Sequence, residues 1–215
     1  MSKEGIPTIL GLLAFAAVLI WIGILFSSTL LFGFAGVALL LAMFSIYFFR
    51  DPKRTPPKGE TLVVAPADGK VIQIETVKED EFMQDRVTKV AIFLSLFDVH
   101  VNYVPFSGKV DYIRYKRGKN LRANSENAAE RNANIFTGLL TPYGKLAFKQ
   151  STGMIARRLV TYLRLGDEVK TGQKFGIIKF GSRMEVFLPH NSNVQVQVGD
   201  RVRAGESIIA QVYEA

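Results

Sequence analysis

Two long apolar runs open the chain, and their lengths match a lipid bilayer. Residues 8–26 and 29–49 contain 19 and 21 residues and no charged side chain. A helix rises about 1.5 Å per residue, so each run would span roughly 28–32 Å, close to the hydrocarbon thickness of a membrane. Ser27 and Ser28 leave room for a tight turn. The pattern predicts a two-helix transmembrane hairpin, with a half-inserted hairpin as the main variant.

A basic, proline-rich segment over residues 50–60 follows the second run. Its prolines stop any helix, and we interpret it as a short linker at the membrane surface. Its excess of Lys and Arg, just after the aromatic residues 47–49, predicts that the following domain lies on the cytoplasmic side of the cell (inner) membrane. A cleaved signal peptide fits poorly, because a second apolar run follows at once. The predicted organisation is an anchor (1–49), a linker (50–60) and a domain (61–215).

Alternating apolar and polar positions dominate the rest of the chain. They predict strands over residues 62–65, 70–76, 87–95, 109–115, 145–150, 174–180, 183–188 and 207–212. The one candidate helix, residues 124–134, is short and polar. We therefore expect a mainly β fold, either a sandwich or a flattened barrel.

An internal repeat refines this expectation. Residues 165–172 (LGDEVKTG) are echoed 33 positions later by residues 198–205 (VGDRVRAG), and each block leads into an apolar strand. The Gly-Asp pair predicts a turn, and the second Gly permits a corner with positive φ. Two such corners are typical of hammerhead-like (biotinyl- or lipoyl-like) folds. A carrier domain would present a Met-Lys pair for modification, but Met184-Glu185 stands in its place.

Composition excludes several kinds of site. The chain of 215 residues has no Cys and only two His, so disulfides, thiolate sites and His-rich metal sites are excluded, and we expect no metal. The first 49 residues carry no net charge, and the remainder carries the whole +8. No nucleic-acid-binding pattern accompanies this basic charge. The basic residues 116–131 predict either a loop over the active site or a plain solvated loop.

Three short blocks hold candidate chemistry, and none is specific alone. Asp68 lies in a turn between two predicted strands, His100 ends an apolar run, and Ser182 follows Gly181 between two strands. Together with residues 48–52 (FFRDP), the blocks 65–71 (APADGKV), 98–102 (DVHVN) and 174–183 (KFGIIKFGSR) closely resemble, in order, the short membrane-anchored form of the phosphatidylserine decarboxylase family.

The resemblance implies a self-processing enzyme of phospholipid biosynthesis that converts phosphatidylserine in the membrane to phosphatidylethanolamine and CO₂. Ser182 would attack the Gly181 carbonyl, and the resulting ester would break by elimination. This would give a β chain (1–181) and an α chain (182–215) that stay associated, with a pyruvoyl group at residue 182. That group, in place of pyridoxal phosphate, would form a Schiff base with the substrate amine. His100 would be the general base and acid, and Asp68 its orienting carboxylate.

One departure from the family pattern leaves a role open. Longer members carry two histidines three residues apart, but the second position here is Tyr103. Either His100 serves both self-cleavage and decarboxylation, or Tyr103 or water takes one role. Two alternatives also stay open: the same chemistry on an ether-linked archaetidylserine, and a non-enzymatic membrane-tethered adaptor. A homo-oligomer is compatible with the sequence.

Overall fold

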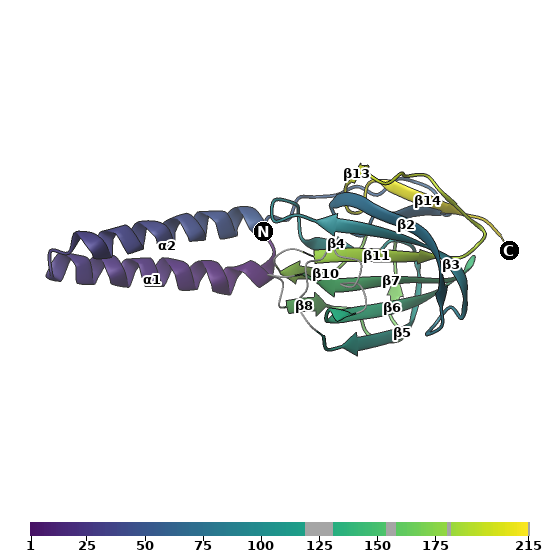
Figure 1. Cartoon of the computed structure of the whole chain (residues 1–215), viewed down its shortest axis with the longest axis horizontal. Coiled ribbons are helices and arrows are strands. Elements are labelled where there is room, and N and C mark those ends of the chain that lie inside the picture. Colours follow the sequence, from purple (N-terminus) through teal and green to yellow (C-terminus); the bar gives the residue numbers. More distant parts are fainter. Residues whose placement is uncertain (119–130, 154–157, 180–181, 215) are drawn as a thin grey trace. The chain divides into compact units, whose positions relative to one another are not determined.

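The computed structural model describes residues 1–118, 131–153, 158–179 and 182–214. Its contacts form two units, Met1–Pro52 and Lys53–Ala215 (Figure 1). The first unit contains η1 (Lys3–Gly5), α1 (Ile6–Leu25) and α2 (Thr29–Phe48). The second contains β1 (Leu62–Val64), β2 (Gly69–Glu79), β3 (Asp85–Leu94), β4 (Val101–Tyr103), β5 (Gly108–Lys116), β6 (Asn134–Thr141), β7 (Gly144–Thr152), β8 (Arg158–Thr161), β9 (Glu168–Val169), β10 (Lys174–Lys179), β11 (Ser182–Leu188), β12 (Ser192–Val194), β13 (Arg201–Val202) and β14 (Ile208–Val212).

The first unit is a helical hairpin held by small residues. The buried positions of α2 include Ala35, Ala38 and Ala42, spaced by three and four residues, so they form one stripe. Small side chains let two helix backbones approach closely, as in membrane helix pairs. Ser2 closes the open end, because its N–H donates to the Phe49 carbonyl at 2.8 Å.

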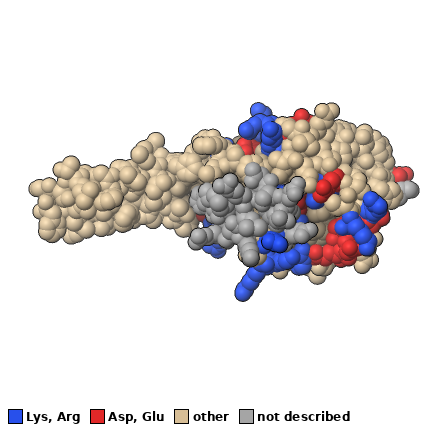
Figure 2. Space-filling view, viewed as in Figure 1, with Lys and Arg blue, Asp and Glu red and all other residues tan. Residues whose placement is uncertain are grey.

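Both helices are long and apolar enough to cross a membrane. The candidate spans, Lys3–Leu25 and Thr29–Phe48, have mean hydropathies of 2.6 and 2.3, yet only 17% and 22% of them are buried within the chain. A core helix of a water-soluble domain would be mostly buried instead. On the face shown in Figure 2, no Lys, Arg, Asp or Glu is visible along the two helices, and charge gathers on the β unit. These exposed apolar surfaces are suited to lipid.

Three antiparallel sheets build the second unit. Eight strands form a curled half-barrel sheet in the order β13-β2-β3-β11-β7-β6-β5-β9 (Figure 1). Two three-stranded sheets, β1-β14-β12 and β4-β10-β8, complete the described strands. The predicted mainly β class is therefore confirmed.

The main core contains the inward-facing residues of all three sheets. Met184, Val186 and Leu188 alternate along β11 and are fully buried in it, whereas Phe187 belongs to a smaller cluster on the opposite face. Since side chains alternate across a strand, the even-numbered positions of β11 share one face. Ser182, at the start of β11, is on that core-facing side.

The internal repeat is a structural repeat. Gly172 and Gly205 have φ of 75° and 71°, so the predicted left-handed corners are present. Each repeat caps its own sheet end in the same way: Val202 pairs with Gly69 of β2, and Val169 pairs with Gly108 of β5. The two ends of the eight-stranded sheet are thus built alike from segments that lie far apart in the sequence.

Some strands were not predicted. β6 follows the candidate helix at 124–134, whose residues up to 130 lie outside the described part, and Asn134 begins the strand. β4, β8, β9, β12 and β13 contain only two to four residues each, too few for a two-residue period to show. Their positions depend on pairing with distant strands.

Candidate active site

Ser182 begins the central strand of the large sheet. It pairs with Leu94 at the end of β3 and with Thr152 at the end of β7. One residue further along, Arg183 pairs with Phe93, which also pairs with Lys70 near the start of β2. The register therefore brings the start of β11, the ends of β3 and β7 and the start of β2 to one end of the sheet.

The Ser182 hydroxyl is buried without a hydrogen-bond partner. Its residue is 0% exposed, and Oγ accepts or donates no hydrogen bond among the described residues. Leaving a buried hydroxyl unpaired costs about 1–3 kcal/mol, so such groups are rare unless they serve a function. Gly181, the other half of the predicted cleavage site, lies outside the described residues.

His100 lies in the connection between β3 and β4 and is 0% exposed. Its Nδ1 is 2.9 Å from the carbonyl oxygen of Asp98, and its own carbonyl accepts a hydrogen bond from Ile178 N–H at 3.2 Å. A carbonyl can only accept, so Nδ1 carries the proton and Nε2 is the basic nitrogen. Asp98 itself is held by Ser95, whose N–H and hydroxyl donate to its carboxylate.

Asp68 is held by the linker and by the C-terminal repeat. Arg54 donates from Nη2 to both carboxylate oxygens at 2.9 and 2.7 Å, and Ala204 N–H donates to Oδ1 at 2.8 Å. Arg54 also pairs with Glu206 at 3.0 Å. Burial alone would lower the pKa of Arg54, but the charges of Asp68 and Glu206 outweigh it and raise that pKa. The hydrogen bonds of Asp68 therefore join it to Arg54 and Ala204.

The two halves of the structural repeat cap the same backbone donor with different side chains. At the equivalent corner of the other half, the Ser107 hydroxyl accepts from Thr171 N–H at 2.9 Å, as Asp68 accepts from Ala204 N–H. A neutral hydroxyl is thus sufficient to satisfy this backbone donor. The carboxylate of Asp68 is in addition paired with Arg54.

Tyr103 lies on the Asp68 side of the site. It is 1% exposed, and its N–H donates to the Pro66 carbonyl at 2.9 Å. A Cβ built on Gly205 would lie 3.2 Å from the Tyr103 ring and 3.7 Å from Arg54, so both side chains pack at this corner. The phenol also contributes to the raised pKa of Arg54. Tyr103 and Asp68 thus share Arg54 as a neighbour.

The opposite face of β11 carries an ion-paired row. Glu185 is 0% exposed and pairs with Lys149 and, at 2.8 Å, with Arg183. Arg183 also donates to Gln73 at 2.6 Å. Breaking such buried pairs leaves an uncompensated charge, so the row fixes the register of β11 against its neighbours.

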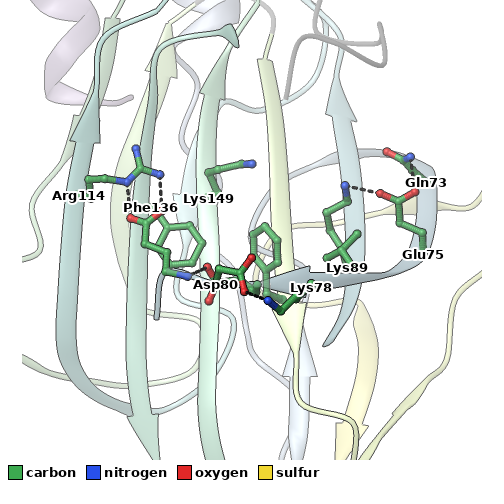
Figure 3. A pocket seen from close by; sticks show the side chains of 12 residues that line it. Gln73, Glu75, Lys78, Asp80, Lys89, Arg114, Phe136 and Lys149 are labelled. Atoms are coloured by element: carbon green, nitrogen blue, oxygen red, sulfur yellow. Dashed lines mark hydrogen bonds and ion pairs between the residues drawn. The ribbon is translucent and has the colours of Figure 1, made fainter. Parts of the chain in front are cut away.

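A cleft of about 430 Å³ lies on this same face, lined by Phe187 and Phe136 among others (Figure 3). Its charges are matched: Lys89 pairs with Glu75 and Arg114 with Glu81. Hydrogen bonding from Lys89 holds the pKa of Glu75 below its usual value. The cleft lies across the sheet from Ser182, and we assign it no part in the chemistry.

Several other expectations concern residues around the site. His190 is exposed and lies 3.4 Å from Asp85. No cluster of three or more metal-ligating side chains occurs among the described residues. The basic segment 116–131 lies mostly outside the described part. The sequence did not indicate Arg54, Glu206 or Thr152, because their partners are distant along the chain.

Comparison with known proteins identifies the class of this chain as a decarboxylase, a lyase. Residues 41–210 match the family model described as phosphatidylserine decarboxylase. Proteins named phosphatidylserine decarboxylase proenzyme from Desulfotalea psychrophila and Syntrophus aciditrophicus are 41% and 42% identical over 213 and 214 residues. The alignments cover 99% and 96% of this chain and 96% and 95% of those proteins. The chain belongs to the phosphatidylserine decarboxylase family, which confirms the resemblance and disfavours the adaptor alternative.

The Arg54–Asp68 contact predicts a measurable loss of stability. Arg54→Gln leaves a largely buried carboxylate without its cation, so we expect the free energy of unfolding to fall by about 1–3 kcal/mol. Urea titration of the full chain in detergent measures this. Lys53→Gln removes the same charge from an exposed neighbour and should change the value by less than about 0.5 kcal/mol. Equal effects of the two substitutions would show that the pair contributes nothing specific.

Proposed function

We propose that this chain is a phosphatidylserine decarboxylase proenzyme that cleaves itself at Gly181-Ser182 and then decarboxylates phosphatidylserine with a pyruvoyl group at residue 182. The observation that carries the proposal is the fully buried, unpaired Ser182 hydroxyl at the start of the central strand, in a chain of this family. The names of the relatives support the substrate and the precursor state.

Self-cleavage needs the chain's own groups and one water molecule. Ser182 Oγ bonds to the Gly181 carbonyl carbon, the peptide C–N bond breaks, and the hydroxyl proton ends on the freed amine. Removal of the residue-182 α-proton then expels the Gly181 carboxylate from Cβ. Water replaces the nitrogen of the resulting dehydroalanine, ammonia leaves, and a pyruvoyl group remains. Burial of the Ser182 hydroxyl suits the first of these reaction steps, because water that would compete with it is kept away.

The fold supports association of the two products. β11, which begins the α chain, pairs along its length with β3 and β7 of the β chain. Arg54 of the β chain also pairs with Glu206 of the α chain. Cutting the chain before Ser182 removes none of these contacts. We therefore infer that the α and β chains stay together.

The pyruvoyl ketone supplies an electron sink for the bond that releases CO₂. The surroundings of residue 182 fit a pyruvoyl group, because the residue is buried and the group would form from Ser182 itself, so that no other nucleophile is needed to attach it. His100, with its proton on Nδ1 and a basic Nε2, is the proposed proton carrier for the substrate α-carbon. Asp68, held by Arg54, is the proposed orienting carboxylate of the site, and Tyr103, which also neighbours Arg54, is a candidate secondary residue.

Membrane residence follows from the same proposal. The two apolar helices would anchor the enzyme in the cell membrane, where its lipid substrate resides. The basic residues after α2 would keep the β domain on the cytoplasmic side.

Substitution of Ser182 tests the proposal directly. Ser182→Ala has no nucleophile and should stay a single folded chain without decarboxylase activity. The wild type, incubated with phosphatidylserine and cyanoborohydride, should couple the lipid amine to its C-terminal fragment. Ser192→Ala, which removes another buried, unpaired serine hydroxyl, should cleave and label as the wild type does. Cleavage of Ser182→Ala at the same bond would refute the assigned nucleophile.

Substitution of His100 tests the proton carrier. His100→Gln should lower CO₂ release by about 100-fold or more, because a neutral amide cannot exchange a proton at neutral pH. His190→Gln, at an exposed position, should leave the rate unchanged. Gel analysis of the same samples identifies the base for self-cleavage. If the His100 variant stays uncut, His100 is the base; if the variant is cut, Tyr103 or water is the base. CO₂ release at the wild-type rate would contradict the role of His100.

A further inference from the structure

A second buried hydroxyl faces Ser182 from the neighbouring strand. Thr152 ends β7, is 1% exposed, and pairs directly with Ser182 across the sheet. Its Oγ1, like the Oγ of Ser182, has no hydrogen-bond partner among the described residues. Two unpaired buried hydroxyls at one cross-strand position are unusual, since buried polar groups are generally satisfied.

The backbone shows how close the two side chains are. Thr152 N–H donates to the Ala133 carbonyl at 2.9 Å, and its carbonyl accepts from Asn132 Nδ2 at 2.6 Å. Both backbone groups of Thr152 are therefore engaged on the side away from β11. Its pair with Ser182 is then of the non-hydrogen-bonded kind, in which the Cα atoms are only about 4.5 Å apart and the side chains are closest.

The fold itself does not require a hydroxyl here. Thr152 shares the core-facing side of the sheet with Ser182, and the next inward position of β11 is the fully buried Met184. Valine has nearly the same shape as threonine and would avoid the cost of an unpaired hydroxyl in such a place. The threonine hydroxyl thus lies directly opposite the proposed nucleophile, and the next inward polar group of its own strand, Gln150, is bonded elsewhere, to Asn102 at 2.9 Å.

We propose that Thr152 is a positioning residue for self-cleavage: its hydroxyl, which is not bonded to Ser182 Oγ in this structure, turns to donate a hydrogen bond to that oxygen and holds it in the rotamer that attacks. This inference rests on the proposed function. As Oγ bonds to the Gly181 carbonyl carbon and the peptide C–N bond breaks, the Ser182 proton passes through the base to the departing amine. Thr152 keeps its own proton throughout and acts only through Ser182.

Three variants test this role on the full chain. Each is made by cell-free translation into liposomes, and the uncut fraction is followed on gels over time. Thr152→Val, which keeps the shape and loses the hydroxyl, should cleave about tenfold more slowly or worse, as when one preorganised donor is lost. Thr152→Ser restores the hydroxyl and should return most of the rate. Ser151→Ala removes the adjacent buried, unpaired hydroxyl from the opposite face and should match the wild type.

Two further measurements separate positioning from folding. Thr152→Val should melt close to the wild-type temperature, because the removal of a buried polar group offsets the loss of one hydrogen bond. Added hydroxylamine, which cuts the ester formed by Ser182, should release less fragment from Thr152→Val than from the wild type in the same time. If Thr152→Val fails to fold, Thr152→Ala takes its place under the same criterion.

The outcomes distinguish the two proposals. A wild-type chain that never cleaves overturns the proposed function, and this inference with it. A wild-type chain that cleaves, alongside a folded Thr152→Val that cleaves equally fast, overturns the role of Thr152 alone. Slow cleavage in both Thr152→Val and Thr152→Ser also overturns it, because the hydroxyl would then not be the group that matters.

Discussion

The antiparallel pairing of β11 with β3 and β7 is the constraint on which the site depends. It fixes Ser182 at one end of the central strand, on the core-facing side, between Leu94 and Thr152. It also sends Arg183 and Glu185 to the opposite face, where buried ion pairs lock the same register. A slip by one residue would exchange these two faces. The strand register therefore fixes the position of the proposed nucleophile, Ser182.

The site combines this rigid strand with groups from distant parts of the chain. Arg54 comes from the linker, Asp68 from the turn before β2 and Glu206 from the turn after the C-terminal repeat, and together they form one ion-paired cluster. At the equivalent corner of the other repeat, the Ser107 hydroxyl accepts from Thr171 N–H in place of a carboxylate. The two corners therefore share their backbone geometry and differ in the side chains that they carry.

The parts of the fold that depend on local pattern could be predicted from the sequence. Local residue patterns along the chain predict the two apolar helices, the long alternating strands and the glycine corners at 172 and 205. The short strands and β6 could not be predicted, because distant pairing defines them. Of the site, Ser182, His100 and Asp68 were indicated by motif resemblance. Arg54 and Thr152 were not, since only the folded register brings each beside its partner.

The intact mass of the purified full-length chain tests the central claim most directly. The account predicts two species: residues 1–181, and residues 182–215 with a mass lower than that peptide by one ammonia, because a ketone replaces the amine of residue 182. Treatment with borohydride should add two hydrogens to the smaller species alone. A single uncut chain in a preparation that releases CO₂ from phosphatidylserine would contradict the account, as would a C-terminal fragment that keeps an ordinary serine amine.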